Sequence, residues 1–496
     1  MGGFFYGGSP LNTLILNQTI LVQIPELYQL YLQHPSIQTD TRKLQKGDIY
    51  WALKGPNFNG NLFAEKALEM GAAYAVADEP VAPKAVHQTT HETTHKAKYE
   101  APHNRIILVD DCLIALQALA KYHREQFDIP FIAITGSNGK TTTKELVATV
   151  LASHFITATT EGNLNNHIGV PLTLLKIKQG TEIAVIEMGA NHQQEIAGYC
   201  TYTEPTHGII TNCGKAHLEG FGGVEGIRKG KGELYDYLRV HDGKVLRYAD
   251  YDYLQEMSQG IAKTFDYGQS SGDVQGQIIS QEFDQEQIFI KEPVLDSNTL
   301  STPQTHSPKT STPFLKVNIT KGFATPTAIH TQLVGDYNLP NVLCAVAIGV
   351  YFKVPEAKII AAIENYAPSN SRSQLMQLGS NQIILDAYNA NPSSMKLAIE
   401  NFARLSVTGK VLMLGGMMEL GEESIAEHEA ITALIDQHHW DHVVLVGGDF
   451  SKIKHHYLYF SDSLAAKAWF LAQEFNNAYL LVKGSRSMQM EKIIQP

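Results

Sequence analysis

The sequence has few cysteines, no excess of positive charge and no long apolar run, and each shortage excludes a class of protein. Its 496 residues contain four cysteines without C-x-x-C spacing, so neither a disulfide framework nor a zinc site is indicated. The formal net charge is −11, which argues against nucleic acid or an anionic membrane as the main partner. We therefore expect a protein of a reducing cytoplasm that binds no nucleic acid.

No segment is typical of a membrane span or a secretory signal. The longest apolar stretch, Val342 to Phe352, is well short of the ~20 residues that a membrane-spanning helix needs. The first lysine or arginine is Arg42, so the N-terminus lacks the charged start of a signal peptide. We expect no membrane span.

The length and composition predict a globular protein of several domains. At 496 residues the chain is too long for one hydrophobic core, and about 150 residues per domain gives roughly three. We expect domains at residues 1–108, 109–367 and 368–496. Two low-complexity segments, residues 84–98 and 296–313, interrupt the pattern as insertions. The first carries three histidines at helical spacing, but its Thr-rich surroundings favour a loop over a metal site, and the second is predicted to be a mobile loop.

Short β-rich runs alternate with helical patterns along the chain, which predicts an α/β fold with mainly parallel sheets. Most of these runs end in Gly or polar residues, where α/β sheets place their ligands. The predicted strands are 49–53 and 73–77 around a helix at 63–70, then 132–135, 183–187 and 208–211, and finally 383–386, 411–414, 443–446 and 479–482.

The stretch FIAITGSNGKTTTKEL, residues 131–146, joins an apolar strand to a helical pattern through a glycine-rich turn. Backbone N–H groups from Ser137 to Thr141 are expected to face an anion at the helix N-terminus, with Lys140 as a point charge and the Thr141 hydroxyl on Mg²⁺. Ile134 stands where the usual P-loop spacing has glycine, and an ordinary strand-to-helix turn is the alternative. Because strand, glycines, lysine and threonines coincide, we predict phosphate binding by Gly136, Ser137, Asn138, Gly139, Lys140, Thr141 and Thr142.

Three further residues carry candidate chemistry. Glu187 ends an apolar strand, so its carboxylate is expected to complete an oxygen shell for Mg²⁺, although a solvated strand-end glutamate is the alternative. His217 is a candidate ligand or base, or a surface histidine. Composition alone predicts that Lys231 is a surface lysine. A role beside Mg²⁺ is not expected from the residue type, because a cation there opposes catalysis unless it binds an anion.

A series of motifs resembles the Mur ligase family over about Thr39 to Glu491. These motifs are TGSNGKTT, EGNLNNHIGVPLTLL, EMGANHQQEI, TNCGKAHLEGFGGVEGI, KGEL, GDYNLPNVLCAVA, DAYNANPSSM, LGGMMELGEES and VKGSRSMQME. The resemblance implies a three-domain α/β fold. It comprises an N-terminal domain for a uridine-diphosphate substrate, a central ATP-binding P-loop domain with a mainly parallel sheet, and a Rossmann-like C-terminal domain.

The resemblance also implies a reaction. Family members form an amide with ATP and Mg²⁺: a peptide carboxylate attacks the γ-phosphate, and an amine displaces the acyl phosphate. The last three motifs are similar to those of members that join D-alanyl-D-alanine to UDP-N-acetylmuramoyl-tripeptide, giving the pentapeptide precursor of peptidoglycan. Those two molecules are the expected substrates. Diaminopimelate and lysine both remain open as the tripeptide's third residue, and we expect a monomer.

The family pattern assigns roles to residues of the central domain. It implies that Thr141 and Glu187 hold one Mg²⁺ and that His217 serves a second. Lys231 matches a lysine that carries a carbamate, which would turn the cation into a carboxylate-like group, and Lys140, His217 and Lys231 are the expected catalytic residues. Asn338 and Asn341 match asparagines near adenine, next to Tyr337 in place of the commoner histidine. At the start of the C-terminal domain, Arg372 and Asp386 match positions that contact the nucleotide after domain closure.

Basic and hydroxyl residues at both ends of the chain match substrate positions. Lys483, Ser485 and Arg486 lie at or after the end of a predicted strand and are expected to bind a carboxylate or phosphate. Thr41, Arg42 and Lys54 lie in a segment that resembles the uridine-diphosphate site, although exposed basic residues need no function. Gly416 replaces a commoner aspartate, so any role of that carboxylate is absent or moved.

Two rival functions use the same loop. A sister ligase would add a single amino acid, or glutamate to folate, and the NANPSSM and GSRSM segments argue against it. A P-loop hydrolase or switch would split ATP without a peptide acceptor, and the uridine-nucleotide-like segment argues against that.

Overall fold

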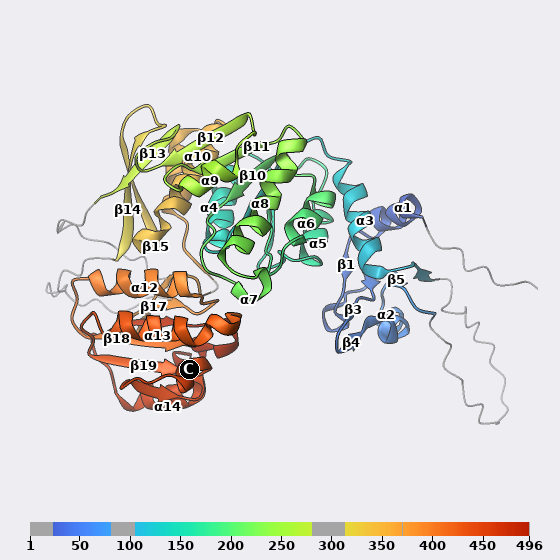
Figure 1. Cartoon of the computed structure of the whole chain (residues 1–496). Coiled ribbons are helices and arrows are strands. Elements are labelled where there is room, and N and C mark those ends of the chain that lie inside the picture. Colours follow the sequence, from blue (N-terminus) through green and yellow to red (C-terminus); the bar gives the residue numbers. More distant parts are fainter. Residues whose placement is uncertain (1–22, 81–104, 280–312, 370, 496) are drawn as a thin grey trace, which may run out of the picture. The chain divides into compact units, whose positions relative to one another are not determined.

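The computed structural model describes residues 23–80, 105–279, 313–369 and 371–495 (Figure 1). The first predicted insertion, all but the last residue of the second, and residues 1–18 lie outside these ranges. Contacts divide the chain into two compact units. One comprises the described residues up to Phe127 with Leu174–Lys176, and the other comprises Asp128–Thr173 and the described residues from Ile177 onward.

The first unit contains a small parallel sheet. Among its described residues the strand order is β1 (Ile37–Gln38), β2 (Ile49–Trp51), β5 (Tyr74–Ala77) and β6 (Ile106–Leu108). Its helices are α1 (Ile24–Gln33), α2 (Ala64–Glu69) and α3 (Cys112–Arg124), and a short hairpin joins β3 (Lys54–Gly55) to β4 (Phe58–Asn59). The Asp111 carboxylate caps α3 by accepting from the N–H groups of Leu113 and Ile114, which satisfies two otherwise unpaired donors.

The second unit begins with a nine-stranded sheet within the described residues. Six neighbouring pairs, from β8 across to β13, are parallel, and β13, β14 and β15 continue as antiparallel strands. The spatial order is β15 (Thr327–Val334), β14 (Phe314–Lys321), β13 (Val274–Ile278), β12 (Lys263–Gly268), β11 (Lys244–Tyr248), β10 (His207–Ile210), β7 (Phe131–Thr135), β9 (Ile183–Glu187) and β8 (Thr157–Thr159).

Helices pack against this sheet and against one another. The longest apolar stretch of the sequence lies in α10, whose residues Val342 to Gly349 are all buried against α4 and the strands β11 to β13. Helix α8 packs against α6, α7 and β10. The helices are α4 (Lys140–Ala152), α5 (Gly169–Leu174), α6 (Glu195–Thr203), α7 (Leu218–Phe221), α8 (Val224–Val240), α9 (Asp252–Met257), α10 (Leu339–Tyr351) and α11 (Glu356–Glu364).

A second sheet forms the C-terminal part of this unit. Strand β16 is antiparallel to β17, and the other neighbouring pairs are parallel. In the described residues the order is β16 (Gln374–Leu378), β17 (Asn381–Asp386), β21 (Tyr479–Lys483), β18 (Lys410–Gly415), β19 (His442–Val446) and β20 (Leu458–Phe460). Helices α12 (Pro392–Arg404), α13 (Ser424–Ile435) and α14 (Ser463–Ala472) alternate with these strands.

The predicted α/β class with mainly parallel sheets is confirmed, and the predicted strands and helix occur within two residues of their expected bounds. Register brings three strand ends together: Ile134 of β7 pairs with Glu187 of β9, and Thr135 pairs with Ile210 of β10. The segments that follow these strands therefore share the carboxyl edge of the sheet, where such folds bind ligands.

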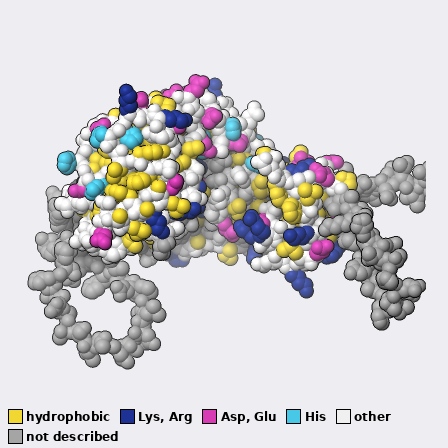
Figure 2. Space-filling model, turned by 90° about the horizontal axis from the view of Figure 1, so that it is seen from below, with side chains coloured by type: hydrophobic (Ala, Val, Ile, Leu, Met, Phe, Trp, Pro, Cys, Tyr) yellow, Lys and Arg dark blue, Asp and Glu magenta, His cyan; other side chains and the backbone are white. Residues whose placement is uncertain are grey.

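The surface carries acidic, basic and apolar side chains side by side on the face shown in Figure 2. Exposed apolar side chains of the C-terminal part include Leu458, Tyr459, Leu464 and Leu471. Across the described ranges, every helix is too short or too polar to cross a bilayer.

Candidate active site

The glycine-rich loop between β7 and α4 has the backbone that only glycine takes easily. Gly136 and Gly139 have φ values of 143° and 78°. A Cβ atom on Gly136 would lie 2.0 Å from the Thr211 hydroxyl oxygen, and one on Gly139 would lie 2.7 Å from Oδ1 of Asn341. The loop is thus packed tightly against the segment after β10 and against α10.

The backbone N–H groups of the loop divide into two sets. The N–H groups of Ser137 and Asn138 donate to the carbonyl and side-chain oxygens of Asn212, at 2.9 and 3.1 Å. These two groups therefore have protein partners in this conformation, and the expectation that the run from Ser137 to Thr141 faces an anion stays a prediction. Helix α4 begins at Lys140, and the first N–H groups of a helix lack partners within it. Binding of an anion at that end stays a prediction.

The side chain of Lys140 lies against this loop. Its ammonium group donates to the carbonyl oxygens of Gly136 and Ser137 at 2.6 and 3.2 Å. Loss of solvent around the ammonium group lowers the pKa of Lys140 to about 8. A bound anion would favour the charged form of this lysine.

Glu187 lies beside the loop with one carboxylate oxygen fully engaged. The Thr141 hydroxyl donates to Oε1 at 3.0 Å, and the Asn165 amide donates to the same oxygen at 2.7 Å. Glu187 is fully buried, and among the described residues Oε2 has no hydrogen-bond partner. A buried, unpaired carboxylate oxygen next to a threonine hydroxyl is the hard-oxygen donor set that Mg²⁺ prefers, so the residues present fit that ion.

Lys231 is not the surface lysine that its neighbours in the sequence suggest. It is 1% exposed on α8, donates to the Ala190 carbonyl at 3.0 Å, and lies 4.8 Å from the centre of the Phe221 ring. Burial, with a smaller effect of Lys140, lowers the pKa of Lys231 to about 7. An unprotonated amine, which carbamate formation requires, is therefore accessible near neutral pH.

His217 directly precedes α7 and has a left-handed backbone, with φ 53°. Its Nδ1 atom forms an ion-pair contact with Oε2 of Glu419, which lies in the loop after β18. This contact lowers the pKa of the Glu419 carboxyl group. His217 therefore lies against an acidic residue that follows a strand of the second sheet, but its Nδ1 atom makes no hydrogen bond among the described residues.

The two predicted adenine-site asparagines are linked to the P-loop helix. The Thr143 hydroxyl donates to the Asn341 side chain at 3.0 Å, and the Asn341 amide donates to Oδ1 of Asn338 at 2.9 Å. Asn338 in turn donates to the Val334 carbonyl at 2.8 Å. Both asparagines are buried, so this chain of bonds fixes their side chains. The neighbouring Tyr337 hydroxyl shares a hydrogen bond with Ser373 at 2.9 Å.

Asp386 and Lys483 meet at the carboxyl ends of β17 and β21. The Lys483 ammonium group lies 2.7 Å from Oδ2 of Asp386, and Lys483 is 1% exposed. The Ser373 N–H group donates to the other oxygen of Asp386 at 3.3 Å. Arg372 stacks on the Tyr388 ring at 3.6 Å. Asp386 therefore has two protein partners in this conformation.

Ser485 and Arg486 differ in environment although they are adjacent. Ser485 is buried, and its hydroxyl donates to the Ala390 carbonyl and accepts from the Met418 N–H group. Arg486 is exposed and pairs with Glu491 at 3.0 Å. Lys483 and Ser485 therefore lie together at the sheet edge, whereas Arg486 contacts η8 (Met490–Ile493) through Glu491.

Of the three predicted substrate residues of the first unit, Arg42 and Lys54 are exposed and paired with acids, and Thr41 is half-buried. Thr41 begins η1 (Thr41–Lys43), and Arg42 makes a bidentate contact with Asp40. Lys54 lies 3.1 Å from Asp78 and 3.4 Å from Glu79. Arg42 and Lys54 thus have different acidic partners.

Hydrogen bonds also join the P-loop and the segment after β10 to the residues at the start of α12. The Asn391 amide donates to Oδ1 of Asn138 at 2.7 Å, and the Lys215 N–H group donates to the Ser393 hydroxyl at 3.0 Å. Asn391 also caps α12 in a capping box, which fixes its position. The family motifs in the sequence contain Asn165, Asn212 and Asn391, so these motifs could have identified the three asparagines as candidate site residues.

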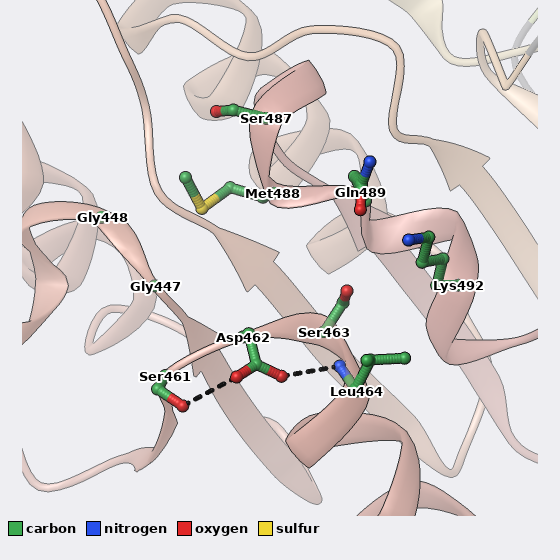
Figure 3. Close-up of a pocket in the computed structure, with 10 residues that line it drawn as sticks. All are labelled: Gly447, Gly448, Ser461, Asp462, Ser463, Leu464, Ser487, Met488, Gln489 and Lys492. Carbon is green, nitrogen blue, oxygen red and sulfur yellow. Dashed lines mark hydrogen bonds between the residues drawn. The ribbon is translucent and has the colours of Figure 1, made fainter.

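A separate pocket of about 220 Å³ lies at the ends of β19 and β20 (Figure 3). Figure 3 shows Gln489 and Lys492 on one side and Asp462 and Ser463 on the other. The Asp462 carboxylate accepts from the N–H groups of Leu464 and Ala465 and so serves as the cap of α14. None of the predicted site residues lines this pocket.

The fold and site together define a P-loop nucleotide-binding protein of the α/β class, with the buried carboxylate of Glu187 beside the loop. Three family descriptions match the chain: "Mur ligase family, catalytic domain" over residues 35–124, "Mur ligase middle domain" over 134–349, and "Mur ligase, glutamate ligase domain" over 371–486. The chain belongs to the Mur ligase family.

Individual relatives extend the match to nearly the whole chain. The chain is 33% identical over 474 residues to the UDP-N-acetylmuramoyl-tripeptide--D-alanyl-D-alanine ligase of Bacillus subtilis (strain 168), covering 92% of each protein. The crystal structure of MurF from Acinetobacter baumannii superposes with a TM-score of 0.74 at 27% identity, covering 94% of this chain and 96% of that one. A MurF ligase structure from Thermotoga maritima in complex with ADP shares the fold, with a TM-score of 0.74 at 23% identity, covering 93% and 96%.

Proposed function

We propose that this protein is an ATP-dependent ligase that joins D-alanyl-D-alanine to UDP-N-acetylmuramoyl-tripeptide and so makes the pentapeptide precursor of peptidoglycan. The relatives that match over nine-tenths of the chain carry this activity in their name. The observation that carries the proposal is the buried pair of Thr141 and Glu187 beside the glycine-rich loop, with Asn391 of the DAYNANPSSM motif bonded to Asn138 of that loop.

The P-loop positions the phosphates for transfer. The N-terminus of α4 and the Lys140 ammonium group bind the β- and γ-phosphates of ATP, since both present positive charge to an anion. The tripeptide carboxylate attacks the γ-phosphorus, ADP leaves, and an acyl phosphate forms. The dipeptide amine then attacks the acyl carbon and loses a proton, and inorganic phosphate leaves as the amide bond forms.

Mg²⁺ would neutralise the charge that develops on the transferred phosphoryl group. Thr141 and Glu187 would hold one ion, and His217 and a carbamate on Lys231 would serve the second. The neutral Lys231 amine adds to CO₂ and loses a proton, which replaces a buried cation by an anionic oxygen donor. The low pKa of Lys231 supports this assignment because it lowers the cost of the neutral amine.

The remaining site residues are assigned to the ligands by the same proposal. Asn338 and Asn341 face adenine, and Arg372 and Asp386 contact the nucleotide when the domains close. Thr41, Arg42 and Lys54 contact the uridine diphosphate group, and Lys483, Ser485 and Arg486 contact a substrate carboxylate or phosphate. The domains are residues 1–108, 109–367 and 368–496, and the protein acts as a monomer in the cytoplasm.

The proposal is tested by incubating the purified protein with ATP, Mg²⁺, UDP-N-acetylmuramoyl-tripeptide and D-alanyl-D-alanine. Mass spectrometry should find the UDP-linked pentapeptide, with the mass of one dipeptide added and one water removed. A parallel reaction with a diaminopimelate- or lysine-containing tripeptide identifies the third residue. No new UDP-linked product with either tripeptide would contradict the proposed function.

A further inference from the structure

Arg228, near the start of α8, is an arginine whose hydrogen-bond donors lack a protein acceptor. The residue is half-buried, and its guanidinium group forms no ion pair or hydrogen bond with any described residue. Its Nε atom is buried as well as unpaired among these residues, so bulk water does not serve it either. Burying a charged donor without an acceptor costs free energy, and such a group in a folded protein calls for a partner.

The ring of Tyr253, on α9, supports this guanidinium group. Its Cζ atom lies 5.1 Å from the ring centre, within the range of a cation–π contact. The Tyr253 hydroxyl accepts from the Cys213 N–H group at 3.2 Å, which holds the ring in place. A guanidinium group on an aromatic ring keeps its N–H edge free for a planar acceptor, and a carboxylate matches that edge with two parallel hydrogen bonds.

Arg228 lies beside the segment that follows β10. Helix α8 packs against β10 (Figure 1), and Arg228 shares one face of the helix with Lys231, three positions later. Burial raises the pKa of the Cys213 thiol to about 12, and Lys231 and Arg228 both oppose this rise, so both cations are close to Cys213. The residue before it, Asn212, accepts from two N–H groups of the P-loop. Arg228 is therefore near the edge of the sheet that carries the P-loop.

The acidic side chains of this part of α8 do not serve Arg228. Glu233 accepts from two backbone N–H groups at the start of α6. Glu225, one turn before Arg228, is exposed and makes no ion pair with it. Lys231, one turn after Arg228, adds positive charge as an unmodified amine. An acceptor for Arg228 is therefore expected from a ligand.

The two tripeptides that remain open as substrates differ in such an acceptor. Lysine ends in an ammonium group alone, whereas the side chain of diaminopimelate ends in an ammonium group and a second carboxylate. In the proposed reaction the carboxylate that becomes the amide lies near Lys140 and Lys231. The side chain of diaminopimelate is long enough to span the single helix turn, ~5.4 Å, between Lys231 and Arg228.

We propose that Arg228 binds the side-chain carboxylate of diaminopimelate and so selects a tripeptide that ends in diaminopimelate over one that ends in lysine. This inference rests on the proposed function and names the substrate more closely. Arg228 is a specificity-determining residue in this account, and the chemistry stays with the residues around the P-loop.

The test measures kcat and KM for pentapeptide formation by the full-length protein with three UDP-linked tripeptides. They end in diaminopimelate, in diaminopimelate with its side-chain carboxyl group converted to an amide, and in lysine. Wild type should have a kcat/KM for diaminopimelate that is roughly 10- to 100-fold above the other two, the effect of one charged hydrogen-bonded pair, mainly through KM. The amide separates the effect of charge from that of shape.

Two variants of neighbouring residues on α8 assign the preference to one side chain. Arg228→Met should lower kcat/KM for the diaminopimelate tripeptide and bring the ratio between the tripeptides close to one. Arg228→Lys should keep part of the preference, because it keeps the charge but loses the two-pronged geometry. Lys229→Met removes an exposed cation from the next position and should keep the wild-type ratio. A thermal melt checks that each variant is folded.

Three results would overturn the inference. The first is equal use of the three tripeptides by wild type, and the second is a ratio lost as fully in Lys229→Met as in Arg228→Met. The third is an equal fall for all three tripeptides in Arg228→Met, which would place Arg228 on a group that they share or on the Lys231 carbamate. Pentapeptide formation without any preference defeats this inference alone, whereas no pentapeptide from any tripeptide contradicts the proposed function as well.

Discussion

The Thr141 hydroxyl lies 3.0 Å from Oε1 of Glu187, although the two residues are 46 positions apart in the sequence. The parallel pairing of β7 with β9 brings them together, because Ile134 is in register with Glu187 and the P-loop follows directly. The pair places a hydroxyl and a carboxylate directly beside the glycine-rich loop, where the proposed reaction needs a divalent ion.

Glu187→Gln should leave the fold intact and raise the Mg²⁺ concentration needed for turnover. The amide oxygen can still accept from Thr141 and Asn165, but the negative charge that a divalent cation needs is lost. We expect kcat to fall by roughly 100-fold or more, about 2.7 kcal/mol of barrier. Turnover measured against Mg²⁺ concentration tests this, and an unchanged Mg²⁺ dependence would remove Glu187 from the metal site.

Lys140→Ala should abolish product formation without lowering stability at pH 7. The variant loses the charge that faces the phosphates. The folded-state pKa of about 8 lies below the ordinary lysine value of 10.5, so the charged form is the disfavoured one in the folded loop. Its removal should therefore leave the melting temperature equal to or above that of wild type. Near wild-type turnover would refute the P-loop assignment.

Lys231→Ala should be nearly inactive, and short carboxylic acids should partly restore activity by replacing the carbamate as oxygen donor. With ¹³CO₂, wild type should show a carbamate signal by NMR that is larger at pH 8 than at pH 6. The sign follows from the pKa of about 7, since only the neutral amine adds to CO₂. Lys229→Ala, an exposed lysine on the same helix, is the control. Full activity of Lys231→Ala would place Lys231 outside the site.

Arg372→Ala should slow turnover more than it weakens substrate binding, because closure of the domains has to complete the catalytic arrangement. The side chain stacks on Tyr388, and because both residues are half-buried the contact contributes about 0.5–2 kcal/mol. Tyr388→Leu therefore serves as the comparison. If it reproduces the kinetics of Arg372→Ala, or if neither variant changes kcat, the role of Arg372 is confined to that stacking.

The parallel strands that the sequence predicts are apolar runs of four to six residues that end at Gly or a polar residue, as in β18 and β21. Other strands that pair in parallel were not predicted, namely β1, β6, β8, β11, β12, β13 and β20. The hairpin of β14 and β15 was not among the predicted strands. Its residues alternate in burial, as a half-buried antiparallel strand does, but the pattern follows a low-complexity segment and was not assigned.

The sequence pattern does not predict which side chains of distant segments come into contact. Asn212 accepts from two N–H groups of the P-loop because β10 lies next to β7 in the sheet. Glu419 contacts His217 because of the position of the loop after β18. Gly416 illustrates the same limit. A Cβ atom there would lie 2.6 Å from the Gly448 Cα atom, so this chain has no room for the aspartate that the family commonly carries.

The most direct test of the ligase account is the stoichiometry of turnover as the acceptor is varied. With ATP, Mg²⁺, UDP-N-acetylmuramoyl-tripeptide and D-alanyl-D-alanine present, ADP, phosphate and new peptide bond should form in equal amounts, and omission of the dipeptide should stop steady turnover. Free L-alanine, D-glutamate or diaminopimelate should not replace the dipeptide. Rapid ADP release with ATP alone, or preference for a single amino acid, would contradict the account.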